Sequence, residues 1–159
     1  MKKLEVFAAK AGQLLDNIAG WGIVATMLLV VVNILLRSVA NSPIQGVYEI
    51  VGFLTAVVIA FGLAWCAMQK SHIAIEFIVE KLPRKVQNII HLISSFVIMV
   101  LLLFISYRLF HHGFKVIASG EVSATAQIPF FPFIFMVALG FLMLFLVELV
   151  NMVKGVVQK

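Results

Sequence analysis

The chain has 159 residues with a formal net charge of +5; 63% of its residues are hydrophobic and only 12% are charged. Soluble domains carry about 45–50% apolar and about 25% charged residues, so this composition excludes a soluble fold, in which so much apolar surface could not be hidden. The length leaves room for several membrane spans and short connections. The single cysteine, Cys66, excludes an intramolecular disulfide and a multi-cysteine metal site.

The first segment, residues 1–16, predicts an amphipathic helix. Apolar residues follow i, i+3, i+4 and i+7 spacing from Leu4 to Ile18, and most polar residues fall elsewhere on the helical wheel. We expect this helix to lie in the inner membrane interface with its apolar face down. The alternative is a cytosolic extension of the first span, because an alanine-rich face is only weakly amphipathic.

Four charge-free stretches then follow, each long enough to cross a bilayer. Twenty helical residues rise about 30 Å, which is the thickness of the hydrocarbon core. We therefore expect an all-α integral membrane protein with spans at about residues 17–37, 48–69, 86–110 and 129–151. None of these spans has an ionisable side chain at its centre, where pumps and ion-coupled carriers normally place one. The chain is predicted to hold a partner in the membrane rather than to drive transport alone.

The basic residues indicate the orientation. Lys and Arg in short loops tend to remain in the cytoplasm. With both termini inside, Arg37, Arg108 and Lys115 lie outside, and the other nine of the 12 basic residues (12 − 3) lie inside. Charges gathered at span ends do not form a nucleic-acid-binding stripe, so no nucleic acid partner is expected. The inner basic residues, Arg84 and Lys85 among them, favour contact with anionic phospholipid.

Two charged residues flank the first outer loop. Arg37 ends the first span and Glu49 opens the second, so both are expected near the same membrane boundary. A partly buried ion pair between them would stabilise the helix pair. The alternative is two solvated anchors among the lipid headgroups, which would contribute little.

The second span carries small residues at every fourth position. The stripe consists of Gly52, Ala56, Ala60 and Ala64. Small residues let two membrane helices approach closely, so the stripe predicts a packing face. The stripe does not reveal whether the neighbouring helix belongs to this chain or to another subunit. One span earlier, Asn33 is expected to form a hydrogen bond between helices.

The two remaining connections differ in character. The inner one, from Lys70 to Pro83, has apolar residues on one helical face and predicts a second interfacial helix. The outer one, from His111 to Ile128, is rich in polar residues and contains Lys115 and Glu121. We expect these two side chains to help receive a partner on the outer side.

The sequence offers little for catalysis or for cofactor binding. In the expected topology His72 and His91 lie near the inner face and His111 and His112 near the outer face, which disfavours a haem bound inside the bundle. Adjacent histidines point to different sides of a helix, so His111 and His112 make a poor metal site. We therefore expect no enzyme activity, no cofactor and no metal.

The ordered set of motifs resembles a known family. Arg37 follows span one and Glu49 opens span two. His72-Ile73 with Glu76 then precedes Leu82-Pro83, and Gly120 precedes Ile128-Pro129. This order is similar to that of the small membrane subunit, or Q-subunit, of tripartite ATP-independent periplasmic (TRAP) transporters, the DctQ-like family. Glu76 departs from the pattern, since aspartate is more usual there.

The resemblance implies that the chain lies in a bacterial inner membrane and has two protein partners. In that family a large membrane subunit, the M-subunit, carries the sodium and substrate sites, and a periplasmic substrate-binding protein delivers an organic acid. The small subunit would brace the static scaffold. The resemblance leaves the substrate open, with sialic acid preferred over C4-dicarboxylates. Two other hypotheses are a membrane-anchor subunit of a redox enzyme complex and a stand-alone small transporter.

Overall fold

The structure, a computed structural model, describes residues 2–68 and 83–157. These residues form four helices, α1 (Lys2–Ala40), α2 (Val47–Met68), α4 (Arg84–Ser119) and α5 (Phe131–Val157). All four are long and apolar enough to cross a membrane, which confirms the prediction of an all-α fold with four helices capable of spanning it. Their orientation in the membrane stays a prediction. The predicted inner interfacial helix, with His72, lies outside the described residues.

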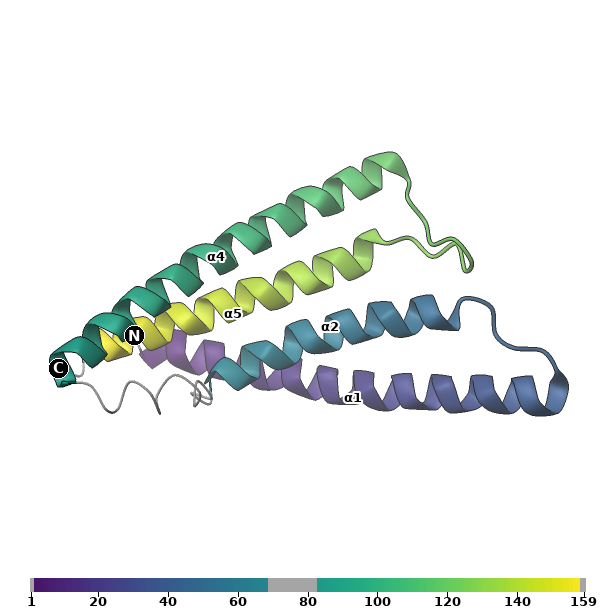
Figure 1. Cartoon of the computed structure of the whole chain (residues 1–159), viewed down its shortest axis with the longest axis horizontal. Helices are drawn as coiled ribbons and strands as arrows, with labels where there is room; N and C mark the ends of the chain where they lie inside the picture. The colour runs from purple at the N-terminus through teal and green to yellow at the C-terminus, as the bar shows by residue number, and fades with distance from the viewer. Residues whose placement is uncertain (1, 69–82, 158–159) are drawn as a thin grey trace.

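The helices form two hairpins that lie side by side (Figure 1). α1 pairs with α2 and α4 pairs with α5, while α2 and α5 meet along the middle of the molecule. The connections 41–46 and 120–130 lie at one end, which we call the loop end, and both chain termini lie at the other. α2 and α5 both run away from the loop end, so the central pair is parallel.

Three of the helices, α1, α4 and α5, extend further than the spans expected from the sequence. α1 is continuous from Lys2 to Ala40, which corresponds to about 58 Å of helix, and α4 reaches Ser119. The described part of the predicted interfacial segment, 2–16, therefore continues into the first span without a break. This continuity is what the alternative of a helical extension requires. Where this segment lies relative to the bilayer stays a prediction.

Helices α2 and α5 approach closely at Gly140. A Cβ placed on Gly140 would lie 2.8 Å from the Cβ of Ala60 and 2.9 Å from its carbonyl carbon and oxygen. One turn further along α2, Ala64 is fully buried. Asn151 then donates a 3.2 Å hydrogen bond from Nδ2 to the carbonyl of Ala67. Small residues thus let the two backbones approach, and one polar contact adds to the packing.

The predicted small-residue stripe is only half used within this chain. Ala60 and Ala64 pack against α5 as described, whereas Ala56 is exposed and Gly52 has no neighbouring atom within 4 Å of a Cβ placed on it. Packing of the stripe within this chain is thus limited to the half away from the loop end, and packing of Gly52 and Ala56 on another subunit stays a prediction. The reason within the chain is that α5 contacts α2 near the loop end through larger side chains, including Phe133 against Phe53.

The hairpins have their own contacts. Ala19 of α1 is buried with Val57 and Phe61 of α2, and Met136 and Val137 of α5 pack against this group. In the other hairpin, the buried Ser106 of α4 donates a 3.4 Å hydrogen bond to the carbonyl of Ala138 in α5. Helix α5 thus packs against both helices of the first hairpin and against α4 of its own hairpin. It is therefore the central helix of the described structure.

The close contact at Ala60 generates a prediction. Ala60→Leu should destabilise the protein by about 1–3 kcal/mol, because added methyl groups must displace the α5 backbone at Gly140. Unfolding of the purified chain in detergent, followed by circular dichroism, measures this loss. Ile59→Leu is the matched control, because Ile59 is adjacent but 55% exposed. Equal stability of the two variants would contradict the close packing.

Candidate functional site

The loop end combines several polar contacts between segments that are distant in sequence. Here α2 begins directly after Gly46, whose carbonyl accepts hydrogen bonds from the N–H groups of Glu49 (3.0 Å) and Ile50 (3.1 Å). Gly46 has a positive φ of 75°, and a Cβ on it would overlap Ala126 of the other connection. Glycine is therefore required there both for the backbone conformation and for space.

The connection 120–130 is folded on itself around Ser123, a residue that is only 2% exposed. The Ser123 N–H donates to the carbonyl of Ile128 (2.9 Å), and the Ile128 N–H donates to the Ser123 hydroxyl (3.2 Å). Gln127 N–H donates to the Ser123 carbonyl (3.2 Å), and an antiparallel bridge joins Val122 to Pro129. These contacts make the connection a compact turn with Thr125 and Ala126 at its tip.

Glu49 binds the tip of this turn. Its Oε1 accepts a hydrogen bond from the N–H of Thr125 and its Oε2 accepts one from the N–H of Ala126, both at 3.0 Å. A carboxylate that accepts hydrogen bonds from adjacent backbone N–H groups is held in a defined orientation. Because Glu49 lies on α2 and the turn connects α4 to α5, this contact links the two hairpins. We call it the Glu49 latch.

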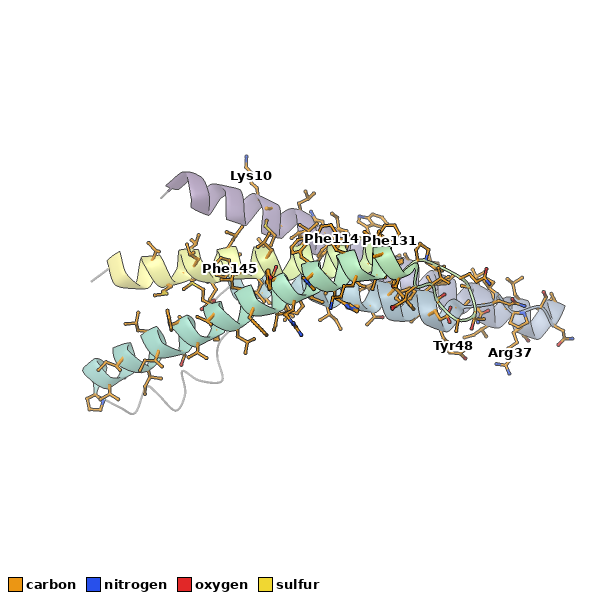
Figure 2. The ribbon with its side chains drawn as sticks, turned by 90° about the horizontal axis from the view of Figure 1, so that it is seen from above. Lys10, Arg37, Tyr48, Phe114, Phe131 and Phe145 are labelled. Atoms are coloured by element: carbon orange, nitrogen blue, oxygen red, sulfur yellow. The ribbon has the colours of Figure 1, made fainter. Side chains whose placement is uncertain are left out.

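Of the two alternatives considered for Arg37 and Glu49, the ion pair is not formed in this chain. Both residues lie at the loop end as predicted, but the Glu49 carboxylate binds the two backbone N–H groups instead. Arg37 is exposed and projects away from the helices, and its side chain has no ion pair with any described residue (Figure 2). Sequence reasoning missed this arrangement because the partners of Glu49 lie 76 and 77 residues further along the chain.

Asn33 also forms a hydrogen bond at the loop end. Its Oδ1 accepts a 2.9 Å hydrogen bond from the N–H of Ile44, in the connection between α1 and α2. The prediction of a helix-to-helix hydrogen bond is therefore wrong, since the partner belongs to a loop. The physical reason is that residues 41–46 fold back beside the last turns of α1, where their N–H groups need acceptors.

Aromatic rings fix the start of α5 from two sides. Phe53 of α2 stacks on Phe133 with ring centroids 4.7 Å apart and meets the edge of Phe130 at 5.3 Å. On the other side Phe135 contacts Phe110 (5.9 Å) and Phe114 (5.3 Å) of α4. Such ring pairs contribute about 0.5–1.5 kcal/mol each beyond burial. The turn held by Glu49 is thus continuous with a packed aromatic layer.

The candidate contact residues Lys115 and Glu121 are both exposed near the loop end. Arg108 lies two turns before Lys115 on α4, at 5.9 Å from the centre of the Phe104 ring, and His111 and His112 are exposed between them. No group of three metal-ligating side chains occurs among the described residues. Whether Lys115 and Glu121 receive a partner stays a prediction, and His72 lies outside the described residues.

One buried charge near the opposite end was not singled out from the sequence. Glu148 of α5 is only 5% exposed, although its position in the sequence marks it merely as the end of a charge-free stretch. It lies one residue after Val147, which packs against Ala67 of α2. Glu148 lies about one helical turn before Asn151, so the helical period puts both residues on the face toward α2. This spacing is the signal that could have identified Glu148 from the sequence.

Comparison with known families identifies the chain. Residues 26–158 match the family described as tripartite ATP-independent periplasmic transporters, DctQ component. The match covers most of the chain, which therefore belongs to the DctQ family, the small membrane component of these transporters. Members work within TRAP transporters beside a large membrane subunit and a binding protein. The family does not favour the redox-anchor alternative. A search of curated proteins found no match.

The Glu49 latch generates a prediction. Glu49→Ala should raise the hydrogen-exchange rates of the Thr125 and Ala126 amides about tenfold, because both lose their acceptor and the turn opens more often. Hydrogen exchange followed by mass spectrometry or NMR measures the effect. Glu121→Ala is the control, since it removes an exposed carboxylate two residues before Ser123. Unchanged exchange in Glu49→Ala would show that the turn does not depend on the latch.

Proposed function

We propose that this DctQ-family chain is a non-catalytic scaffold subunit that braces the large membrane subunit of a sodium-coupled TRAP transporter. The transporter would lie in the bacterial inner membrane and import an organic acid delivered by a periplasmic binding protein. The family match carries the proposal as far as the transporter class. Bracing goes beyond that match and rests on the arguments below, whereas sodium coupling and the substrate class are proposed from the family resemblance.

The main support is the absence of ionisable groups at mid-depth. Between residues 17–36, 50–67, 92–107 and 131–147 the sequence contains no Asp, Glu, Lys, Arg or His. Ion-coupled carriers normally place such a group where the coupling ion or proton is handled inside the membrane. We therefore assign the sodium and substrate sites to the large subunit and a structural contribution to this chain.

The hydroxyl groups inside the helices support the same conclusion. Thr26 and Thr55 donate to carbonyls one turn earlier in their own helices, at 2.8 and 2.7 Å, and Ser106 donates to α5. The hydrogens of these three hydroxyl groups are already used, so they offer no free donor to a polar substrate. Together with the Glu49 latch, these contacts favour a body of fixed shape.

Two flanks remain available for a large partner. The helices at the edges of the molecule, α1 and α4, expose many large apolar side chains, including Leu28 and Leu35 of α1 and Ile93 and Phe96 of α4. In a bilayer such a face contacts either lipid or another helical subunit. Each edge helix packs against this chain on one side only. Its other side is therefore available to pack against a large subunit, as a scaffold role requires.

An organic acid as the substrate is proposed from the family resemblance alone, which leaves open which acid is carried. We propose sialic acid in preference to a C4-dicarboxylate. Both are carboxylates, so a binding protein and a large subunit that accept either would need cationic sites of their own.

Reconstitution tests the proposal. A tagged copy of this chain should co-purify with one large membrane protein, and liposomes should take up radiolabelled N-acetylneuraminate or succinate only when both membrane chains, the binding protein and a sodium gradient are present. Omitting this chain should reduce uptake to background with the large subunit still inserted. Uptake by this chain alone would contradict the scaffold role, and a Soret absorbance band would favour the redox anchor.

Charge reversal tests the outer face. Lys115→Glu or Glu121→Lys should slow uptake several-fold at limiting binding protein but little at saturation, because a low-affinity polar contact mainly affects encounter. Lys10→Glu, at the opposite end of the molecule, is the matched control. The membrane complex should co-purify intact in all three variants. Equal uptake at every concentration of binding protein would exclude Lys115 and Glu121 from docking.

A further inference from the structure

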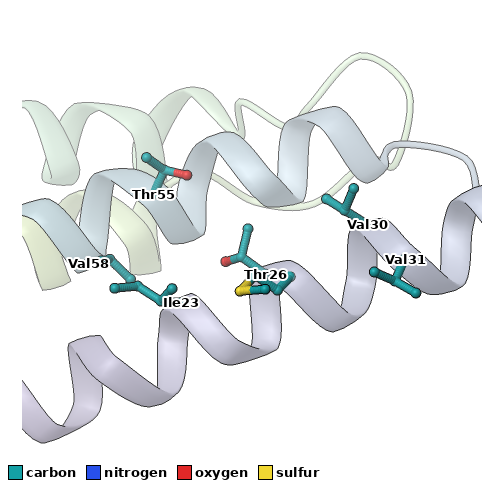
Figure 3. Close-up of a pocket in the computed structure, with 7 residues that line it drawn as sticks. Ile23, Thr26, Val30, Val31, Thr55 and Val58 are labelled. Carbon is teal, nitrogen blue, oxygen red and sulfur yellow. The ribbon is translucent and has the colours of Figure 1, made fainter.

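An apolar groove runs between α1 and α2, in the half of the molecule nearest the loop end (Figure 3). Its volume is about 440 Å³, within the range of roughly 300–1,000 Å³ that holds a small ligand. It is lined mainly by Ile23, Thr26, Val30 and Val31 of α1 and by Thr55 and Val58 of α2. Along α1 the groove extends over eight residue steps from Ile23 to Val31, or about 12 Å.

The chemistry of the lining calls for an apolar occupant. The two hydroxyl groups in it, on Thr26 and Thr55, already donate to the carbonyls of Gly22 and Val51 in their own helices. They therefore present methyl groups and no free donor. The 12 Å length is close to half of a hydrocarbon core about 30 Å thick, the depth of one leaflet.

The lining also disfavours a transmembrane helix as the occupant. Helices in membranes pack closely where small residues let the backbones meet, as Ala60 and Gly140 do in this chain. The groove residues include neither glycine nor alanine, and their two small residues, Thr26 and Thr55, use their hydroxyl groups within their own helices. The remaining lining consists of branched side chains and methionine, against which a flexible acyl chain can pack.

A cation and an amphipathic ring lie beyond the loop end of the groove. Arg37 is seven residues after Val30, so the two share a face of α1 with Arg37 about 10 Å further out. Tyr48 is seven residues before Thr55 on α2 and shares a face with it in the same way. Figure 2 shows the side chains of Arg37 and Tyr48 pointing to the same side of the molecule. Both are exposed, and the Arg37 side chain has no ion pair with a described residue.

We propose that this groove is a phospholipid site, with one acyl chain between α1 and α2 and the phosphate bound by Arg37. Guanidinium groups bind phosphate through paired charge-assisted hydrogen bonds. Tyr48 lies between the apolar groove and Arg37 along the membrane normal, at the level where tyrosine rings favour the interface. The inference requires that the helices lie in a bilayer and does not depend on the bracing role or on the substrate.

The binding test uses the full chain in detergent, titrated with dioleoylphosphatidylglycerol and observed by native mass spectrometry. Arg37→Gln should weaken binding of the first lipid about tenfold, as expected when one charge-assisted contact is lost. Arg108→Gln is the control, because it removes another exposed arginine from the same half of the molecule. Dioleoylglycerol, which has the same chains and no phosphate, should bind the unchanged protein as weakly as the phospholipid binds Arg37→Gln.

A second pair of variants tests the groove itself. Val31→Phe should reduce binding because the ring fills the channel, whereas Val32→Phe should not, since Val32 is similarly exposed (44% against 50%) but is absent from the lining. Equal binding by all four variants would overturn the site and leave only adventitious lipid at the surface. Loss with Val31→Phe alone would overturn the assignment of the phosphate to Arg37. Loss of the large subunit from Val31→Phe, with lipid binding unchanged, would identify a protein helix as the occupant and overturn the proposal.

Discussion

The Glu49 latch is the contact on which the arrangement of the two hairpins depends. One carboxylate on α2 holds two adjacent N–H groups at the tip of the connection between α4 and α5. With that tip fixed, Phe130 and Phe133 meet Phe53, and α5 then runs beside α2 until Gly140 faces Ala60. In a membrane, apolar helices gain little from hiding from lipid, so such directed contacts decide which helix lies beside which.

Much of the fold follows from the sequence because a bilayer permits few alternatives. A charge-free stretch of twenty residues must form a helix there, since every backbone N–H and C=O has to be bonded internally. The positions of Arg37 and Glu49 at a common end, and a close contact through Ala60 and Ala64, follow from hydrophobic patterning and small-residue spacing. The helix ends were less predictable, because α1 and α4 remain helical beyond the apolar stretches.

The contacts of the loop end could not be predicted in the same way. Charge alone suggested that Glu49 would pair with the nearest arginine, yet two backbone N–H groups more than seventy residues away bind it. Likewise, nothing local distinguishes Gly52 and Ala56 from Ala60 and Ala64. The difference arises because large aromatic rings separate α2 from α5 near the loop end and small residues let them meet further down. The partner of Glu49 and the small residues that pack closely are thus determined by the course of the 120–130 connection and of α5. They are not determined by the neighbouring residues in the sequence.

The parallel course of α2 and α5 has an electrical consequence. Each helix carries a macrodipole equivalent to about +0.5 elementary charge at its N-terminus, and both N-termini lie at the loop end. Two parallel dipoles side by side repel each other, and low dielectric surroundings strengthen that repulsion. The antiparallel flanks α1 and α4 offset part of it. Glu49, in the first turn of α2, places a full negative charge at the positive end of that helix. The carboxylate that binds the turn therefore also offsets part of the positive potential at the loop end.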